Sequence, residues 1–387
     1  MNGTRIVVLG AGVVGSACAR ELVAAGFEVV VVDRHRPAGA TTAHGEGNVL
    51  VSDKDDGPEL RLAQLSRRLW PEALAGIDAD RVEWDPKGGI VVATTEAGVA
   101  DLAAFAARQR AAGVHAEQLD PEALAEAEPH LTREVAAAYH YPEDAQVQPV
   151  AAAAALLSAA IAEGATLRTG CEVIGAITRG GRITGLRTSQ GDLHADAVVN
   201  ATGPWAGEVA TKLGAPVDVR PRRGEVLVTT PLPPTVFHKV YDADYVGAVG
   251  SSDAELQTSA VVESTRGGTL LLGSSRRQVG FDDRLRPHVL SAIAARALRL
   301  FPGLAGVPVM RAYGGFRPYV PDHLPLIGED PRISGLWHNT GHEGAGIGLA
   351  PGSARVLADL VRGRVPEVDA KPFRVDRPAV LGEGGTK

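Results

Sequence analysis

The sequence predicts an α/β protein with two sheets, one a doubly wound parallel sheet and the other mainly antiparallel. The parallel sheet is indicated by an apolar run, residues 5–9, that leads through three glycines into a helix pattern. A second apolar run, residues 27–32, ends at Asp33 and completes a β-α-β unit. The other sheet is indicated by residues 221–316, in which alternating or apolar runs dominate.

The glycine-rich turn after the first strand has the layout of a dinucleotide site. Gly10 makes the tight turn, Gly12 lets the backbone approach a pyrophosphate, and Gly15 lets the helix pack close to the sheet. The helix start presents free N–H groups to phosphates, and Asp33, 23 residues after Gly10, is placed to accept ribose hydroxyls. By itself this turn fits NAD and FAD equally, and a turn without any ligand is the structural alternative.

Composition limits the class of function. The 387 residues are 45% hydrophobic, which is enough for two packed domains, whereas a net charge of -7 and 4% aromatic residues disfavour nucleic acid as a partner. Cys18 and Cys171 are far apart and lack metal-ligand spacing, so we expect no disulfide framework, metal site or iron–sulfur cluster in this chain. The first strand follows Met1 almost directly, and no apolar run reaches spanning length, so we expect a cytoplasmic protein without a membrane span.

Along the chain, helix and strand patterns alternate in two separated groups. We expect helices over residues 59–74, 96–112, 121–127, 149–163, 288–300 and 350–362, and strands over residues 81–95, 166–169, 197–200 and 335–339, with a meander over 172–189. The chain crosses between domains more than once. The nucleotide-binding domain is predicted to comprise residues 1–80, 145–219 and 317–387, and the substrate domain residues 81–144 and 220–316.

Three later blocks, together with the opening turn, resemble the D-amino acid oxidase superfamily of flavoproteins. They are residues 199–205, 315–328 and 341–348, and the resemblance covers nearly the whole chain. Residues 45–54, 221–228 and 262–265 are most similar to the catalytic β subunits of heteromeric dehydrogenases. That group includes D-hydroxyproline dehydrogenase, opine oxidase, L-proline dehydrogenase and hydrogen cyanide synthase. The resemblance implies a Rossmann-type FAD-binding domain, and FAD is expected to be non-covalent because neither cysteine lies late in the chain.

The resemblance also assigns residues to the cofactor. The loop with Thr41 and Thr42 is implied to wrap the pyrophosphate, and Val173 to lie on the strand that contacts adenine, although core packing is the alternative for Val173. The glycine-rich loop before the last long helix is implied to face the flavin. The full set of expected cofactor contacts is Gly10, Gly12, Val13, Val14, Gly15, Asp33, Arg34, Thr41, Thr42, Gly47, Asn48, Val173, Thr202, Gly203, Trp205, Gly341, Gly344, Ala345, Gly346 and Ile347.

Arg317 is the candidate anchor for a substrate carboxylate, because an arginine fork fixes orientation through two charge-assisted hydrogen bonds. It matches the arginine that performs this role in similar enzymes, and a structural ion pair is the alternative. Glu46 is a candidate proton acceptor, with a solvated loop carboxylate as the alternative. His342 and Glu343 are candidates for the substrate face, or else cap a helix or face solvent.

Three aromatic residues, Tyr241, Tyr245 and Trp205, are candidate walls of the substrate cavity, with packing at a domain boundary as the alternative. Tyr245 is counted with the catalytic candidates.

The resemblance implies FAD-dependent oxidation of an amino acid or secondary amine to the imine, by hydride transfer from Cα to flavin N5. The substrate is expected to be a D-amino acid or imino acid such as D-hydroxyproline, with electrons passed to a second flavoprotein and an iron–sulfur subunit. A stand-alone glycine or sarcosine oxidase that uses oxygen is one alternative. A non-catalytic flavin-bearing subunit and a nicotinamide-dependent reductase are two others.

Overall fold

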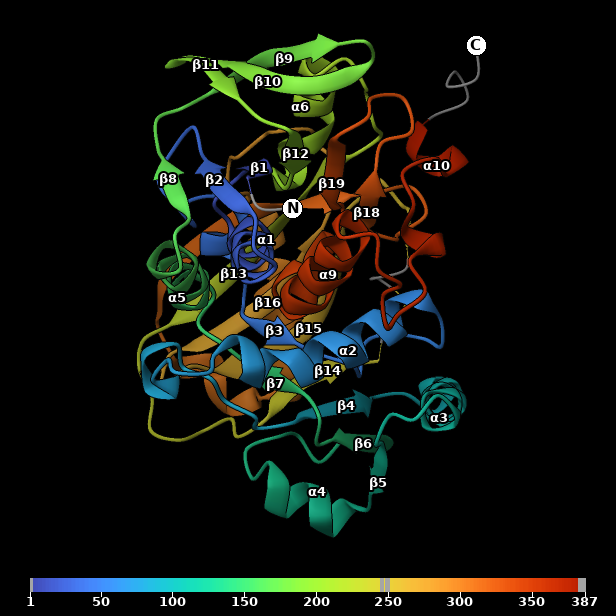
Figure 1. Cartoon of the computed structure of the whole chain (residues 1–387). Helices are drawn as coiled ribbons and strands as arrows, with labels where there is room; N and C mark the ends of the chain where they lie inside the picture. Colours follow the sequence, from blue (N-terminus) through green and yellow to red (C-terminus); the bar gives the residue numbers. More distant parts are fainter. Residues whose placement is uncertain (1–2, 244–246, 248–250, 382–387) are drawn as a thin grey trace.

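The computed structural model describes residues 3–243, 247 and 251–381 (Figure 1). Its first sheet has six strands in the order β18-β19-β12-β1-β2-β8, parallel except for β18. The strands are β1 (Arg5–Leu9), β2 (Glu28–Val32), β8 (Thr166–Arg168), β12 (Ala197–Asn200), β18 (Leu326–Glu329) and β19 (Leu336–Thr340). Strand order reverses beside β1, which is the point where open α/β sheets bind ligands.

Both faces of this sheet are buried, because alternate side chains of β1 enter two different cores. Ile6 and Val8 pack with the helices α1 (Val13–Ala24), α2 (Pro58–Ala73), α5 (Pro149–Ala162) and α9 (Gly346–Val361). Val7 and Leu9 pack under α6 (Ala206–Lys212) and a three-stranded sheet of β9 (Val173–Arg179), β10 (Arg182–Thr188) and β11 (Gly191–His194). A continuous apolar run such as residues 29–32 of β2 is typical of such two-sided burial.

The second sheet has eight strands in the order β17-β13-β16-β15-β14-β4-β6-β5. Its strands are β4 (Gly89–Ala93), β5 (Glu117–Leu119), β6 (Ala137–Tyr141), β13 (Arg220–Thr229), β14 (Lys239–Asp242), β15 (Gln257–Ser264), β16 (Leu270–Arg276) and β17 (Val309–Tyr319). Neighbours are antiparallel except β14 and β4. Helix α8 (Pro287–Leu300) packs on it, and α3 (Glu96–Ala111) and α4 (Pro121–Ala127) follow β4 and β5. The predicted domain boundaries stay a prediction, and β17 runs across the one placed between residues 316 and 317.

Short elements complete the chain between the two sheets. Strands β3 (Asn48–Val49) and β7 (Ala145–Gln146) pair with each other, and α10 (Pro378–Leu381) lies near the end of the described chain. Among the residues that the structure describes, no helix is both long and apolar enough to cross a membrane.

Two expectations about local structure are wrong. Residues 81–88 are not a strand, because the turn at Gly88, with φ +77°, separates β4 from the preceding helical turn Ala79–Arg81. The last long helix begins at Gly346 rather than at residue 350. Its glycines are not loop residues but contact points: a Cβ on Gly348 would lie 3.0 Å from the Asn48 carbonyl oxygen, and one on Gly352 would lie 2.9 Å from Ser66 Cβ.

A buried carboxyl joins the loop after β3 to the eight-stranded sheet. Asp144 Oδ1 accepts the Val51 N–H at 2.9 Å, and its Oδ2 accepts the Ser52 hydroxyl. Ser52 Oγ in turn accepts the hydroxyl of Tyr241 on β14. Burial raises the pKa of Asp144 from its ordinary value of 3.8 to about 7.

This raised pKa predicts a pH dependence of stability. The folded state binds the Asp144 proton more tightly than the unfolded state, so the contribution of Asp144 to the free energy of unfolding falls as pH rises from about 4 to about 7. Asp144→Asn should reduce that fall, as measured by urea unfolding at several pH values. The exposed carboxylate of Asp101 gives the matched control, Asp101→Asn. Equal pH dependence in the wild type and Asp144→Asn would contradict the prediction.

Candidate active site

A cavity of about 690 Å³ lies where the carboxyl ends of the parallel strands meet the eight-stranded sheet. The ends of β1, β2, β12 and β19 line one side, and β13 and β17 line the other. Most of the predicted site residues line it. They are Gly10, Gly12, Val13, Val14, Asp33, Arg34, Thr41, Thr42, Glu46, Gly47, Asn48, Val173, Thr202, Gly203, Trp205, Arg317, His342, Glu343, Gly344, Gly346 and Ile347.

The remaining predicted residues are placed differently. Gly15 supports the turn from behind, since a Cβ there would lie 1.9 Å from the Gly10 carbonyl oxygen. Gly341, with φ +79°, makes the turn after β19, and Ala345 packs against the core; neither lines the cavity. Tyr241 does not wall the cavity as expected, because its side chain is fully buried in the core beside Ser52. Tyr245 lies outside the described residues.

The opening turn is shaped by close backbone contacts. Gly10 has φ +99°, and a Cβ there would lie 2.7 Å from the Ala201 carbonyl oxygen. Gly12 is the N-cap of α1 and has no side chain to occupy the helix end, so the end faces the cavity. Thr42 Oγ1 accepts the Val13 N–H at 3.0 Å, which fixes the second loop beside the first. A helix start with free N–H groups suits an anionic pyrophosphate, and the pyrophosphate contact stays a prediction.

Asp33 already has partners in this structure. Its Oδ2 accepts the Ala11 N–H at 2.8 Å, and its Oδ1 accepts the His35 N–H at 2.7 Å. Each carboxylate oxygen has more than one acceptor direction, so these bonds orient the group and leave it able to accept a ribose hydroxyl. The ribose contact stays a prediction.

An aromatic stack and a surface ion pair were not identified from the sequence. The Arg34 guanidinium lies 4.8 Å from the centre of the Trp205 ring, and Trp205 stacks on Phe281 at 5.3 Å. Glu172 and Lys212, both lining the cavity beside Val173, form an ion pair at 2.8 Å. No motif in the sequence marks these contacts, because the partners are brought together only by the fold.

Arg317 lies on β17, and small residues lie next to its guanidinium. It is paired with Arg222 in the β13–β17 register, and its Nη1 donates to the Ser275 carbonyl at 2.9 Å. A Cβ on Gly224 would lie 2.1 Å from Nη1, and one on Gly344 would lie 3.3 Å from Nε. Both glycines therefore provide space for the guanidinium beside the cavity. Gly224 was missed, although the glycine after two arginines is visible in the sequence.

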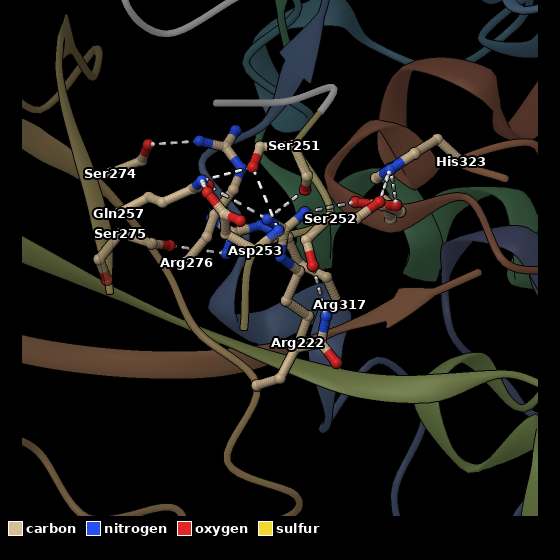
Figure 2. Close-up of polar contacts among 12 residues, drawn as sticks. Arg222, Ser251, Ser252, Asp253, Gln257, Ser274, Ser275, Arg276, Arg317 and His323 are labelled. Atoms are coloured by element: carbon tan, nitrogen blue, oxygen red, sulfur yellow. Dashed lines mark hydrogen bonds and ion pairs between the residues drawn. The ribbon is translucent and has the colours of Figure 1, made fainter. Parts of the chain in front are cut away.

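Glu343 is held by basic groups and is not a solvated carboxylate. Its Oε1 accepts from His323 Nδ1 at 2.7 Å and its Oε2 from Arg222 Nη1 at 3.2 Å. Ser252 Oγ lies 2.9 Å from His323 Nε2 and extends this network, as Figure 2 shows. Glu343 and His323 have φ +46° and +59°, which are strained values for residues other than glycine and are concentrated at functional sites. His323 was not identified from the sequence.

His342 is an uncharged cavity residue. Its side chain is almost completely buried, and this burial lowers its pKa to about 3. Within the described part of the chain, its Nε2 has no hydrogen-bond partner. A neutral imidazole therefore stands beside Glu343, and it is not a source of positive charge near neutral pH.

The cavity fits an FAD-type cofactor on three observations. Its lining residues extend from the open end of α1 to the first turn of α9, where Gly346 and Ile347 line it. Its turns are made of glycines, and a side chain at these positions would fill the space available to the cofactor. Glu46 Oε1, Asn339 Oδ1 and His342 Nε2 are buried at its wall without hydrogen-bond partners among the described residues. The non-covalent mode of binding stays a prediction.

Gly12→Ala tests the pyrophosphate contact. The new methyl group would meet only Thr42 Oγ1, at 3.1 Å, so the fold should persist while the approach of the phosphate is blocked. We expect flavin affinity to fall about tenfold or more, equivalent to about 1.4 kcal/mol, in fluorescence titration of the apoprotein. Gly303→Ala, at an exposed position with no atom near the new methyl, is the control. Unchanged flavin affinity would contradict the assignment.

Comparisons with known proteins agree with this geometry. The family model described as FAD dependent oxidoreductase matches residues 5–360. Glycine oxidase of Pseudomonas aeruginosa is 31% identical over 376 residues, covering 95% of this chain and 98% of that protein. The bifunctional protein ThiO/ThiG of Trichormus variabilis is 30% identical over 92% of this chain, and the chain spans 52% of that protein's length.

Among solved structures, glycine oxidase from Geobacillus kaustophilus superposes with a TM-score of 0.86 at 27% identity, covering 97% of this chain and 99% of that one. The predicted fold class, superfamily, FAD cofactor and oxidoreductase class are thereby confirmed. This chain belongs to the family of FAD-dependent oxidoreductases.

Proposed function

We propose that this enzyme oxidises an α-amino acid or a related secondary amine to the imine. The observation that carries the proposal is the position of Arg317, whose guanidinium lies beside the turn that enters α9 and lines the same cavity as Gly10 and Gly12. An arginine fork at this place would hold a carboxylate close to the flavin end of the cavity. Substrate and cofactor would then share one enclosed space.

The residues of the chain would supply placement and electrostatics. When bound, FAD supplies the electron-accepting ring that takes the hydride from Cα. The first turn of α9, with Gly346 and Ile347 at the cavity, presents backbone N–H groups and the positive end of the helix dipole to negative charge. The Ser275 carbonyl orients Arg317, and the Arg222–Glu343 ion pair fixes the adjoining turn. The carboxylate bound to Arg317 would fix the orientation of Cα.

Two candidate functions differ in the molecule that accepts electrons from the flavin. The resemblance to heteromeric dehydrogenases supports transfer to a partner flavoprotein and an iron–sulfur subunit, with a D-amino acid or D-hydroxyproline as substrate. The likeness to glycine oxidase over nearly the full length of both chains favours a stand-alone oxidase. A flavin-bearing subunit without its own substrate is the third reading, and it gives Arg317 no catalytic role.

An anaerobic screen tests the reaction and the substrate together. The purified holoenzyme is mixed with glycine, sarcosine, both enantiomers of proline and hydroxyproline, and other D- and L-amino acids, while flavin absorbance is followed. We expect bleaching by a carboxylate-bearing amine. Failure of all such amines to bleach the flavin would reject the proposal.

Arg317→Ala should weaken binding of the substrate while flavin remains bound. Loss of a charge-assisted fork costs about 2 kcal/mol, or roughly 30-fold in the apparent dissociation constant from flavin-reduction rates. Arg311→Ala is the control, because Arg311 is exposed on the same strand. An unaltered constant in Arg317→Ala would remove the proposed anchor and favour the non-catalytic reading.

The acceptor is tested by exposing the reduced enzyme to air. If a partner takes the electrons, we expect oxygen to reoxidise the flavin more slowly than turnover with an artificial dye acceptor. The measurement is stopped-flow absorbance after anaerobic reduction by the substrate that the screen identifies. Reoxidation by oxygen as fast as dye-coupled turnover would support the stand-alone oxidase instead.

A further inference from the structure

A buried charge cluster lies behind Glu46, on the side of the eight-stranded sheet. Lys239 on β14 donates from Nζ to Glu263 Oε2 at 2.9 Å and to Asn48 Oδ1. The same Nζ lies 3.8 Å from Glu46 Oε2, which also accepts Asn48 Nδ2 at 3.1 Å. Three elements, the loop into β3, β14 and β15, therefore bring two carboxylates to one ammonium group.

Burial makes the charge balance of this cluster important. The side chains of Glu46, Lys239 and Glu263 are 9%, 3% and 0% exposed. Within the described residues, Glu46 Oε1 and Glu263 Oε1 have no hydrogen-bond partner. A buried carboxylate without full compensation is costly, and binding a proton removes the cost. The two carboxylates and one ammonium leave an excess negative charge that one proton would neutralise.

Other titratable groups around the cluster do not remove this excess. Lys87 donates to the Ser264 carbonyl at 2.6 Å, and its charge is attracted both by Glu263 and by Asp85, which lies 3.5 Å away. Lys87 and Asp85 carry opposite charges, so together they add no net charge to the cluster. Burial, followed by the charges of Glu46 and Glu263, raises the pKa of Tyr313 above its ordinary value, so its phenol stays neutral. Burial also raises the pKa of Glu263, in the direction expected for a cluster that attracts a proton.

Glu46 is the member of this cluster that reaches the cavity. It lines the cavity together with Arg317, and Thr41 Oγ1 donates to the Phe316 carbonyl at 2.9 Å, which attaches its loop to the strand of Arg317. A Cβ on Gly273 would lie 2.1 Å from Glu46 Oε1, so that glycine provides the space for the carboxylate. Lys239 and Glu263 do not line the cavity; Lys239 lies behind Glu46, and Glu263 binds Lys239 in turn.

We propose that Glu46 accepts the proton of the substrate's ammonium group, and that Lys239 and Glu263 are positioning residues that set its affinity for that proton. This inference rests on the proposed oxidation of an amine. The ammonium N–H bond breaks and an O–H bond forms on Glu46. The freed nitrogen lone pair then forms the C=N bond as the hydride leaves Cα with two electrons for FAD. The proton neutralises the cluster and returns to solvent after the product leaves.

Two substitutions of the positioning residues have opposite expected effects. Glu263→Gln leaves Lys239 to stabilise the Glu46 anion alone, so the acidic limb of the pH profile for anaerobic flavin reduction should move to lower pH. Lys239→Met removes the ammonium, so the same limb should move to higher pH. Each shift should be about one pH unit or more, as expected for a charge at this separation. Shifts in the same direction, or none, would overturn the proposal.

Glu128→Gln is the matched control, because Glu128 is also fully buried but is bound to the backbone N–H of Phe237 and to His238. It should leave the limb in place. Glu46→Gln should abolish the limb and lower the rate of flavin reduction by about a hundredfold or more. The flavin spectrum and thermal unfolding of each variant show whether it has folded, and Glu263→Gln and Glu46→Gln preserve shape if Lys239→Met does not fold.

An infrared titration separates failure of this inference from failure of the proposed function. The resting holoenzyme, without substrate, is titrated while the C=O stretch of protonated carboxyl groups is followed. We expect a band that Glu46→Gln removes and that Glu263→Gln shifts to a lower titration midpoint. If no amine reduces the flavin but this band is present, the proposed function fails and the proton site stands. If the band is unaffected in both variants, the proton site is rejected whichever substrates react.

Discussion

Close approach of backbone to backbone is the constraint on which the rest of this structure depends. Helix α9 reaches β3 and α2 only because Gly348 and Gly352 carry no side chains at the contact. Ser66 Oγ donates to the Gly348 carbonyl at 2.6 Å and accepts the Gly352 N–H, which replaces helix bonding around the internal Pro351. The same principle shapes the turn at Gly10. The cavity exists where these tight contacts bring strand ends, loops and a helix start together.

The charges around the cavity follow a consistent arrangement. Backbone N–H groups and helix starts face the part where an anionic cofactor would lie, whereas two of the cavity carboxylates are bound to basic side chains. Glu343 is held between Arg222 and His323, and Glu46 lies against Lys239. The strained backbone of Glu343 is retained because several partners hold its side chain. Ion pairs therefore hold these carboxylates in place both at the cavity surface and behind it.

The sequence predicted the fold class, and most of its candidate site residues lie at the cavity, because glycine turns, strand periodicity and family blocks are local signals. It could not predict the His323–Glu343 or Glu46–Lys239 contacts, which join residues 20 and 193 positions apart and form only when the chain folds. Helix α9 was misplaced because its glycines look like a loop in sequence, whereas tertiary contacts hold them helical. The sequence left open whether Tyr241 walls the cavity or packs in the core, because an aromatic residue at a boundary has no local sign of which side it packs on; the structure places it in the core.

The pairing of β4 with β14 has a consequence for how the chain folds during synthesis. Lys239–Asp242 pairs with Gly89–Ala93, so β4 cannot form this pairing until about 150 further residues have been synthesised. The parallel sheet likewise needs Leu336–Thr340 before its order is complete. Such long-range pairings slow folding and leave apolar edges exposed on the ribosome. The nascent chain must therefore be nearly finished before either sheet can close.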